Sequence, residues 1–382
     1  MRENNMAVKL KPIVKWAGGK EQELKFIKPA MPQNFDRYFE PFVGGGAVYF
    51  NVGDQHPKFI NDKSVELIDL YKSIANDNGQ FHELLAGVIR DWDFIETFVF
   101  LHKDEFNSIY TNFREDLSAD NFLKEQVTIF FENHNDLFTN ILIGDLGINA
   151  ENFRKELNKS LLSKLIRMKK IEVTKTRMPE GDILDNIEGA IKAAYYMHVR
   201  NLYNNAKKLN ISTDFYEVIF YFIRNYAYSG MFRYNAKGEF NVPYGGIGYN
   251  KKSLAPKLSY IKGKSLVAYL KETKIFNLDF EDFFKHTKPK ENDFIFLDPP
   301  YDTEFSTYAQ NEFNKDDQAR LANYLLNECN AKWMIVIKNT PFIYDLYNKK
   351  HLDMSSFSKK YLVSFQNRND KNAEHLLIRN YV

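Results

Sequence analysis

Residues 37–52 read Arg-Tyr-Phe-Glu-Pro-Phe-Val-Gly-Gly-Gly-Ala-Val-Tyr-Phe-Asn-Val, an apolar run that is followed by three glycines and a second apolar run. The first run predicts a strand over Arg37–Val43, and the second predicts a helix that begins over Ala47–Val52. The pattern that follows predicts a strand over Lys58–Asn61 and a helix over Val65–Ile74. This strand–turn–helix–strand order predicts two parallel strands joined by a right-handed crossover.

The same alternation returns after about residue 265 and continues to the end of the sequence. Strands are expected at Lys274–Leu278, Asp293–Leu297, Lys332–Ile337, Leu352–Phe357 and Leu376–Tyr381, with a helix at Asp316–Glu328. Strands that alternate with helices indicate an α/β fold with an open, mainly parallel sheet covered on both faces.

The middle of the sequence has a different pattern. Apolar residues recur at three- and four-residue spacing over Phe81–Tyr110, Glu151–Met168 and Ala190–Leu209, which predicts a mostly helical block over about 80–222. The stretch Met231–Pro243 then predicts a hairpin whose turn is Asn-Ala-Lys-Gly. We therefore expect one α/β domain formed by 1–79 and 265–382, interrupted by an inserted domain over 80–264.

Composition narrows the class of protein. The chain has 382 residues, 44% of them hydrophobic, and no apolar run of the length that a membrane span needs. The first twenty residues carry charges without an apolar stretch, so no secretory signal is expected. The single cysteine, Cys329, excludes an internal disulfide and is interpreted as a small buried thiol. Together these features predict a soluble, cytoplasmic protein.

Positive charge is concentrated in two stretches. The net charge is +2, yet residues 224–264 contain eight basic residues and one acidic residue, and residues 151–177 contain nine basic and three acidic ones. Such local excess is typical of a surface that meets a polyanion. For 151–177 a solvated helix face remains an equal alternative, because its lysines and arginines recur at helical spacing.

The glycine turn indicates a nucleoside ligand without a pyrophosphate. Gly44-Gly45-Gly46 follows a strand, as in dinucleotide-binding folds, but Tyr49 stands where the fingerprint needs Gly or Ala. Glu40, near the end of the strand, would repel phosphate and suits a cationic amino-acid group instead. Asp62 ends the next strand and is placed to accept hydrogen bonds from ribose hydroxyls, with a helix N-cap as the alternative.

The tetrapeptide Asp298-Pro299-Pro300-Tyr301 follows the apolar strand Phe294–Leu297. An exocyclic amino nitrogen is a poor nucleophile, and a carboxylate together with a backbone carbonyl can accept its two N–H groups and favour a pyramidal nitrogen. Consecutive prolines stiffen the turn and offer only carbonyls. Tyr301 offers a face on which a base can stack. We therefore interpret Asp298, Pro299, Pro300 and Tyr301 as the catalytic residues.

In combination, these motifs resemble the Dam-type (class alpha, D12 class) DNA adenine N6-methyltransferases. The matching stretches are Lys15–Lys20, Glu40–Gly46, Asp62, Arg233–Gly245, Asp279-Phe280, Asp298–Tyr301 and Arg368–Leu377. The resemblance implies a Rossmann-like methyltransferase sheet, S-adenosylmethionine as methyl donor, no metal, and site-specific methylation of adenine N6 in double-stranded DNA. It places the donor at Trp16, Lys20, Glu40, Phe42, Gly44, Gly46, Asp62, Asp279 and Phe280.

The resemblance also assigns residues to DNA and to a target. Lys15, Met231, Arg233 and Pro243 match positions that meet base edges, Tyr228 matches an aromatic wedge, and Asn235 and Asn241 match phosphate contacts. A GATC or related GAT-containing site is the target that these positions imply. Ser229 and Gly246 depart from the family pattern, and the 171 residues from Asp62 to Arg233 exceed its usual length.

Several readings remain open from the sequence alone. A methyltransferase for the cytosine amino group or for RNA would use related chemistry, and a DNA-binding homologue without catalysis would keep the fold. A nicotinamide oxidoreductase is disfavoured by Tyr49. A cognate restriction endonuclease in a prokaryotic or phage system is a candidate partner, and no membrane partner is expected.

Overall fold

The computed structural model describes residues 9–16, 18–115, 120–134, 141, 144–301, 313–360 and 372–381. The expected closing segment at Arg368–Leu377 therefore lies partly outside the described residues. The chain divides into two compact units, an α/β unit of Met1–Asn78, Phe232–Tyr234 and Ile261–Val382, and a helical unit of Gly79–Met231 and Asn235–Tyr260. The functions expected for the two domains stay predictions.

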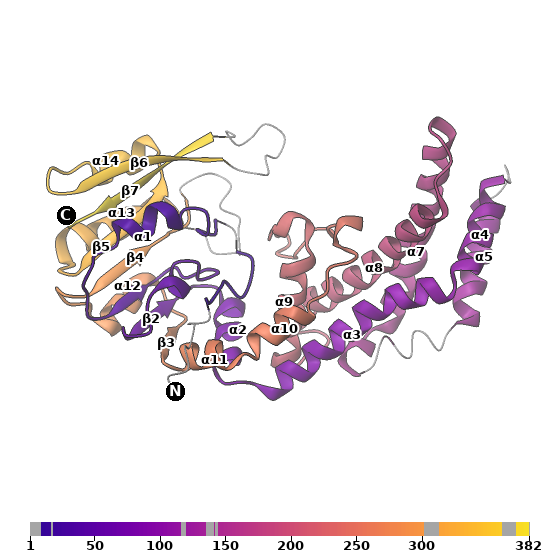
Figure 1. The fold of residues 1–382 in the computed structure, drawn as a ribbon, viewed down its shortest axis with the longest axis horizontal. Helices are drawn as coiled ribbons and strands as arrows, with labels where there is room; N and C mark the ends of the chain where they lie inside the picture. Colours follow the sequence, from indigo (N-terminus) through magenta and orange to yellow (C-terminus); the bar gives the residue numbers. More distant parts are fainter. Residues whose placement is uncertain are drawn as a thin grey trace, which may run out of the picture. The chain divides into compact units, whose positions relative to one another are not determined.

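The α/β unit contains a seven-stranded sheet of order β3-β2-β1-β4-β5-β7-β6 (Figure 1). Its strands are β1 (Tyr38–Glu40), β2 (Lys58–Asn61), β3 (Thr273–Phe276), β4 (Phe294–Leu297), β5 (Lys332–Lys338), β6 (Asp353–Lys360) and β7 (Asn372–Arg379). Strands β1 to β5 are parallel, and β7 runs antiparallel between β5 and β6. The predicted α/β fold with a mainly parallel sheet is confirmed.

The order of the strands places a switch point between β1 and β4. Phe39 pairs with Phe59 of β2 on one side and with Ile295 of β4 on the other. The chain runs outward from β1 in one direction and from β4 in the other, so the loops after these two strands diverge to opposite sides. In open parallel sheets this divergence leaves a crevice at the carboxyl ends of the strands, where ligands bind.

Both faces of the sheet are covered, because consecutive residues of the central strands, whose side chains point to opposite faces, are buried. Phe39, Ile295 and Trp333 belong to one buried cluster that includes residues of α12 (Phe280–Thr287), α13 (Lys315–Asn323) and α14 (Pro341–Tyr347). On the other face α2 (Val65–Ala75) contacts α11 (Lys264–Lys271) and β3. The short helix α1 (Leu24–Ala30) precedes β1.

The sequence predicted an α-helix after the glycine turn, and this prediction is wrong. Instead of a helix over Ala47–Val52, the chain makes one 3-10 turn at Tyr49–Asn51. The Asn51 backbone N–H bonds to the Val48 carbonyl at 2.8 Å, while its side-chain amide takes the Ala47 carbonyl at 2.9 Å. Because the side chain occupies the acceptor that an α-helix would use, the backbone tightens and ends.

Smaller differences also have local causes. Strand β1 ends at Glu40 because Pro41 has no N–H for the ladder. The predicted helix over Asp316–Glu328 is α13 followed by a π-helical turn over Tyr324–Glu328. The predicted strands at Leu352–Phe357 and Leu376–Tyr381 are present as the antiparallel pair β6 and β7.

The helical unit is built from long helices, as predicted. They are α3 (Gly79–Leu101), α4 (Lys103–Glu115), α5 (Asp120–Asn133), α7 (Ala150–Thr174), α8 (Glu180–Asn204), α9 (Thr213–Tyr226) and α10 (Ala255–Ile261). Helix α8 contacts α3, α7 and α9, and Trp92, Tyr195 and Phe222 meet edge to face among them. Within the described residues, every helix is too short or too polar to span a bilayer.

The predicted hairpin is a turn without a regular ladder. The Asn235 N–H bonds to the Glu239 carbonyl at 2.8 Å, but residues 227–246 form only single-residue bridges, such as Ala227 with Tyr244. Ser229 has a φ of 53°, and Pro243 lacks a donor, so a continuous ladder is interrupted on both sides.

Candidate active site

The glycine turn after β1 is held in a conformation that needs glycine at two positions. Gly44 and Gly46 have φ of +48° and +77°. A Cβ on Gly44 would lie 2.7 Å from Cδ1 of Trp16, and one on Gly46 would lie 2.6 Å from the Tyr71 hydroxyl. The Tyr71 hydroxyl also donates to the Gly44 carbonyl at 3.1 Å. The turn therefore has a fixed shape next to the end of β1.

Asp62 fastens this turn to the start of α2. Its carboxylate accepts from the backbone N–H groups of Gly44 and Ser64, each at 3.0 Å. Ser64, and not Asp62, is the N-cap of α2, because its hydroxyl accepts from Leu67 N at 3.3 Å. Burial raises the pKa of Asp62 to about 6, although the hydrogen bonds from Ser64 and Gly44 oppose the rise.

Glu40 is a buried acid at the end of β1, with 2% of its surface exposed. It accepts a hydrogen bond from the Tyr38 hydroxyl at 2.6 Å. Burial raises the pKa of Glu40 well above its usual value, the Tyr38 hydrogen bond opposes this, and the negative charges of Asp298 and Asp62 raise it further. Three carboxylates thus converge where β1, β2 and β4 end.

Asp298 follows β4 and forms an ion pair with Lys20, a residue of the loop before α1. Lys20 is 2% exposed, and its ammonium group also donates to the Gly18 carbonyl at 3.0 Å and the Tyr301 hydroxyl at 3.2 Å. The Tyr301 ring lies 5.5 Å from the ring of His375 on β7. Lys20 therefore fixes the first and last residues of the Asp-Pro-Pro-Tyr motif.

One of the two proline carbonyls in the motif has a hydrogen-bond partner on α13. The Pro300 carbonyl accepts from Nε2 of Gln318 at 2.7 Å, and Gln318 is fully buried on α13. The sequence analysis did not identify Gln318. Its only signal is a polar residue on the same helix face as Leu321 and Ala322.

Asn61 is a second residue that the sequence analysis missed. Buried at the end of β2, it donates to the Pro41 and Leu278 carbonyls, both at 3.0 Å, and accepts from Leu278 N at 2.8 Å. These bonds tie the loops after β1, β2 and β3 together. Asn277 adds a bond of 2.8 Å to the Asp62 carbonyl.

Aromatic side chains stand next to these loops. Phe42 lies 5.9 Å from Phe280 and 5.5 Å from Phe313, measured between ring centroids. Asp279 caps α12 and is paired with Lys63 and Arg320 at 3.3 and 3.5 Å. Burial raises the pKa of Asp279, but hydrogen bonds from the Glu281 N–H, Arg320 and Lys63 outweigh it and leave the pKa lowered.

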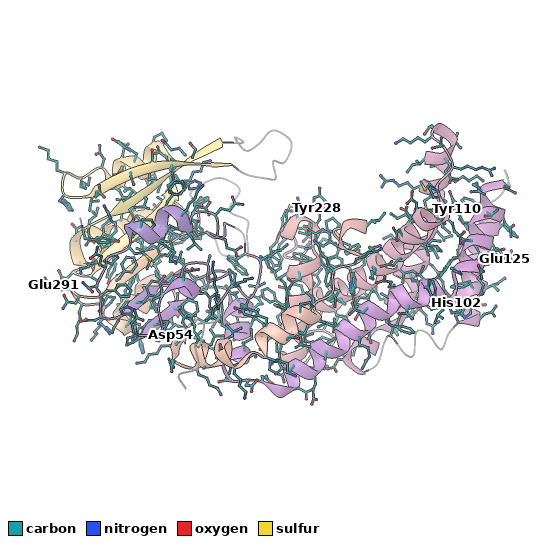
Figure 2. The ribbon with its side chains drawn as sticks, in the orientation of Figure 1. Asp54, His102, Tyr110, Glu125, Tyr228 and Glu291 are labelled. Carbon is teal, nitrogen blue, oxygen red and sulfur yellow. The ribbon has the colours of Figure 1, made fainter. Side chains whose placement is uncertain are left out.

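The residues expected to contact DNA are distributed over both units. Lys15 is exposed on the α/β unit. In the helical unit, Tyr228, labelled in Figure 2, is 45% exposed, and its N–H bonds to the Pro243 carbonyl at 2.9 Å. The Asn235 side chain bonds within its own turn, where its Oδ1 accepts from Lys237 N and Glu239 N at 2.9 and 3.0 Å. Of the other residues expected to contact DNA, Met231 and Asn241 are half-buried, and Arg233 and Pro243 are exposed.

A parallel sheet with a reversed β7 strand, with acids gathered at its switch point, is the architecture of the methyltransferase fold. The family model of the D12 class N6 adenine-specific DNA methyltransferases matches residues 16–182 and 164–364. The chain belongs to this family and is an adenine-specific DNA methyltransferase. The family thus decides for adenine in DNA over the cytosine amino group or RNA.

Relatives of similar length support this assignment. The chain is 27% identical over 377 residues to a type II methyltransferase of Paramecium bursaria Chlorella virus NC1A, covering 97% of this chain and 100% of the relative. It is 26% identical over 392 residues to a type II methyltransferase of Methanocaldococcus jannaschii, covering 98% and 100%. A DNA adenine methylase of Haemophilus influenzae is 31% identical over 159 residues, which cover 38% of this chain and 52% of that protein.

Proposed function

We propose that this enzyme methylates adenine N6 within a GAT-containing site of double-stranded DNA, of which GATC is the simplest form. The chemical part of the proposal rests mainly on one observation, the Asp298 carboxylate held by Lys20 beside the buried acid Glu40 and the half-buried Asp62. The target part rests on the residues around the Asn235 turn.

The residues present suit S-adenosylmethionine, the donor that the family implies. Three carboxylates converge on the ends of β1, β2 and β4, and their mutual repulsion contributes to the raised pKa of Glu40. A ligand with sulfonium and ammonium groups would offset this charge. In our proposal Glu40 receives the ammonium end, Asp62 the ribose, and Phe42 with Phe280 the purine ring.

The shape of the proposed donor site also depends on Trp16, Gly44 and Gly46. The indole of Trp16 lies against Gly44, so the turn can approach a ligand only because neither glycine carries a side chain. Asp279 would meet the purine edge from the N-cap of α12.

The proposed chemistry assigns one task to each residue of the motif. When bound, S-adenosylmethionine supplies a methyl group on a positively charged sulfur. The Asp298 carboxylate and the Pro299 carbonyl accept the two N–H groups of the adenine amine, so that the nitrogen lone pair faces the donor. Gln318 already engages the Pro300 carbonyl, which favours Pro299 as the acceptor. Tyr301 stacks on the base after it leaves the duplex.

Lys20 acts on Asp298 rather than on the substrate. Its ammonium group compensates the carboxylate and fixes its orientation, with the Gly18 carbonyl and the Tyr301 hydroxyl as further anchors. A preorganised acceptor needs no rearrangement as the amine becomes nucleophilic. Lys20 is therefore proposed as a positioning residue.

Target choice is proposed to depend on four side chains. Arg233 can donate two hydrogen bonds to guanine in the major groove, and Lys15 can read a second guanine. Met231 and Pro243 offer apolar surface to a thymine methyl group. Tyr228 is proposed as the wedge that enters the base stack, because its exposed ring stands on a turn held by the Pro243 carbonyl.

Phosphate contacts are proposed for the two basic stretches, 151–177 on α7 and 224–264, and for Asn241. Asn235 was expected in the same role. Because its amide and carbonyl already bond within the turn, we propose that it shapes the turn, with any phosphate contact secondary.

The target is tested by expressing the full chain in a host without adenine methylation and sequencing the DNA with a method that reports N6-methyladenine. A methylated motif that contains GAT supports the assignment. A motif without GAT overturns the target assignment and leaves the activity standing.

A cognate restriction endonuclease is the partner that we propose, since two relatives are named type II methyltransferases. Expression of this chain should then protect host DNA from endonucleases that cut the methylated motif. Cleavage of that DNA at fully methylated sites would contradict a protective role.

A further inference from the structure

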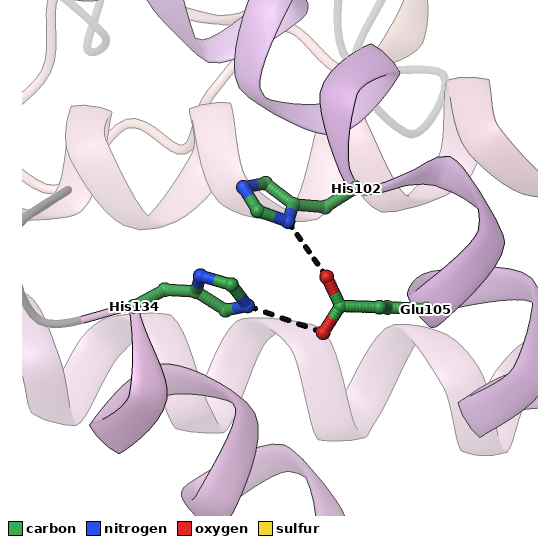
Figure 3. A group of neighbouring side chains, drawn as sticks. All are labelled: His102, Glu105 and His134. Atoms are coloured by element: carbon green, nitrogen blue, oxygen red, sulfur yellow. Dashed lines mark hydrogen bonds and ion pairs between the residues drawn. The ribbon is translucent and has the colours of Figure 1, made fainter.

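Two histidines and a glutamate meet at one end of the helical unit, outside every residue set used above. His102 follows the last residue of α3, and Glu105 lies one turn further on, in the first turn of α4. His134 follows the last residue of α5. Helices α4 and α5 contact each other, which brings His134 next to the α3–α4 junction (Figure 3).

The three side chains point their ligand atoms at one another. His102 Nδ1 lies 2.8 Å from one Glu105 carboxylate oxygen, and His134 Nε2 lies 3.1 Å from the other. One ligand atom from each residue lies within 4.8 Å of both others. In a tetrahedral zinc site with bonds of about 2.0–2.1 Å, ligand atoms are roughly 3.3 Å apart. A slight opening of this cluster would therefore admit the ion.

The imidazole rings are held by aromatic neighbours. The His102 ring lies 4.6 Å from the Phe98 ring, and the His134 ring lies 4.6 Å from the Phe130 ring. The two imidazole rings are themselves 4.1 Å apart. An apolar surround of this kind limits the access of solvent to a metal site and lowers the dielectric around it.

One side of the cluster is open to water. The side chains of His102 and His134 are 23% and 21% exposed, and that of Glu105 is 53% exposed. Zinc sites with three protein ligands take a water molecule as the fourth ligand, and an open side provides for it. Two imidazoles with one carboxylate suit zinc or a neighbouring first-row divalent ion better than calcium or magnesium, which prefer oxygen alone.

We propose that His102, Glu105 and His134 bind a zinc ion, or a similar divalent transition metal, that clamps the α3–α4 junction to the end of α5. None of the residues proposed for methyl transfer contributes to this site, since all of them belong to the α/β unit. No metal was expected from the sequence, and this proposal departs from that expectation. Metal that binds only the folded helical unit stabilises that unit.

The test uses the full-length chain, stripped with a chelator and titrated with zinc chloride by calorimetry. The wild-type chain should bind one equivalent more than a variant that combines His102→Ala with His134→Ala. A matched control, His351→Ala, changes an exposed histidine of the turn before β6 and should bind as the wild type does. Equal stoichiometry in the wild type and the double variant would overturn the proposal.

A second variant guards against misfolding of the double variant. Glu105→Gln keeps the size of a half-exposed side chain, removes its charge, and should weaken zinc binding at least tenfold. Zinc should raise the thermal unfolding midpoint of the wild type and of His351→Ala, and the rise should be lost in Glu105→Gln. An unchanged rise in Glu105→Gln would show that the ion binds elsewhere.

Discussion

Replacing Lys20 by methionine isolates the ion pair that orients Asp298. The change keeps the length and apolar stem of the side chain but removes the ammonium group and its contacts with Asp298, the Tyr301 hydroxyl and the Gly18 carbonyl. Removing one partner of a fully buried ion pair costs about 3–5 kcal/mol. The loss of an ordinary hydrogen bond to a charged group costs about 1.5–3 kcal/mol.

The expected magnitude falls in the lower of these two ranges. The Lys20 side chain is 3% exposed, but that of Asp298 is 21% exposed, so water partly replaces the lost partner. We therefore expect a loss of about 2–3 kcal/mol in transition-state stabilisation, which corresponds to a rate reduction of roughly 30- to 160-fold. Part of the lost interaction will also appear as a lower unfolding midpoint.

The assay is single-turnover methyl transfer to a DNA duplex that contains the methylated motif, with donor and DNA affinities measured in parallel. The control is Lys25→Met, which removes an exposed ammonium group that lies over the Phe26 ring. A positioning role requires that the Lys20→Met rate fall while DNA affinity stays within a few-fold of wild type. A Lys20→Met rate within twofold of the control would refute the role assigned to the ion pair.

Four further outcomes are expected. Asp298→Ala should abolish methyl transfer with donor and DNA binding largely retained, and near wild-type single-turnover rates would remove Asp298 from the mechanism. Because the pKa of Asp62 is raised to about 6, donor affinity should fall as pH drops through about 6 and the carboxylate acceptor is protonated; calorimetry on Asp62→Asn should give weaker binding with a smaller pH dependence, the remainder coming from Glu40, whose pKa burial also raises, and an undiminished pH dependence would remove Asp62 from this role. Arg233→Ala should cost about 1–3 kcal/mol in binding and relax selection at one base pair, as binding to duplexes with single substitutions would report; uniform weakening on all duplexes would instead indicate a phosphate contact. Burial raises the pKa of Asp91 on α3 to about 7, so the folded state favours the protonated form of this side chain. The free energy of unfolding should therefore fall as pH rises from about 4 to about 7. Asp91→Asn should raise the unfolding midpoint at pH 8 more than at pH 5, and equal shifts at both pH values would exclude this linkage.

The parts of the fold that the sequence predicted are those whose local pattern has one structural solution. Phe294–Leu297 and Trp333–Ile337 are continuous apolar runs, the composition typical of a strand buried on both faces, and Lys58–Asn61 carries two apolar residues between polar ends. Their ends carry Asp62 and Asp298, so the edge of the sheet where the site lies was also predictable. The long helices α7 and α8 follow from apolar residues at helical spacing.

The features that were missed depend on partners far away in the sequence or on competing local bonds. Lys20 and Asp298 are separated by 278 positions, and nothing in either stretch specifies the other. The 3-10 turn at Tyr49–Asn51 depends on a side-chain amide that competes for one carbonyl. His102, Glu105 and His134 were missed because 29 residues separate the last two, a spacing unlike the common zinc motifs.

The insertion of the helical unit between β2 and β3 also determines the order in which the protein can assemble during synthesis. Strand β1 pairs with β4, yet the codons for the whole of α3 to α9 are translated between them. Domains fold as units while the chain emerges, so the helical unit can become native before β4, the central neighbour of β1, has been synthesised, when only β1 and β2 of the sheet are present. Pairing of two strands that lie so far apart in the sequence is slow, because the loop between them must close, at an entropic cost, before the stabilising contacts form. A premature stop codon before Phe294 would therefore release a product with a folded helical unit and with the β4-facing edge of β1 exposed, a species suited to aggregation and to clearance by the cell.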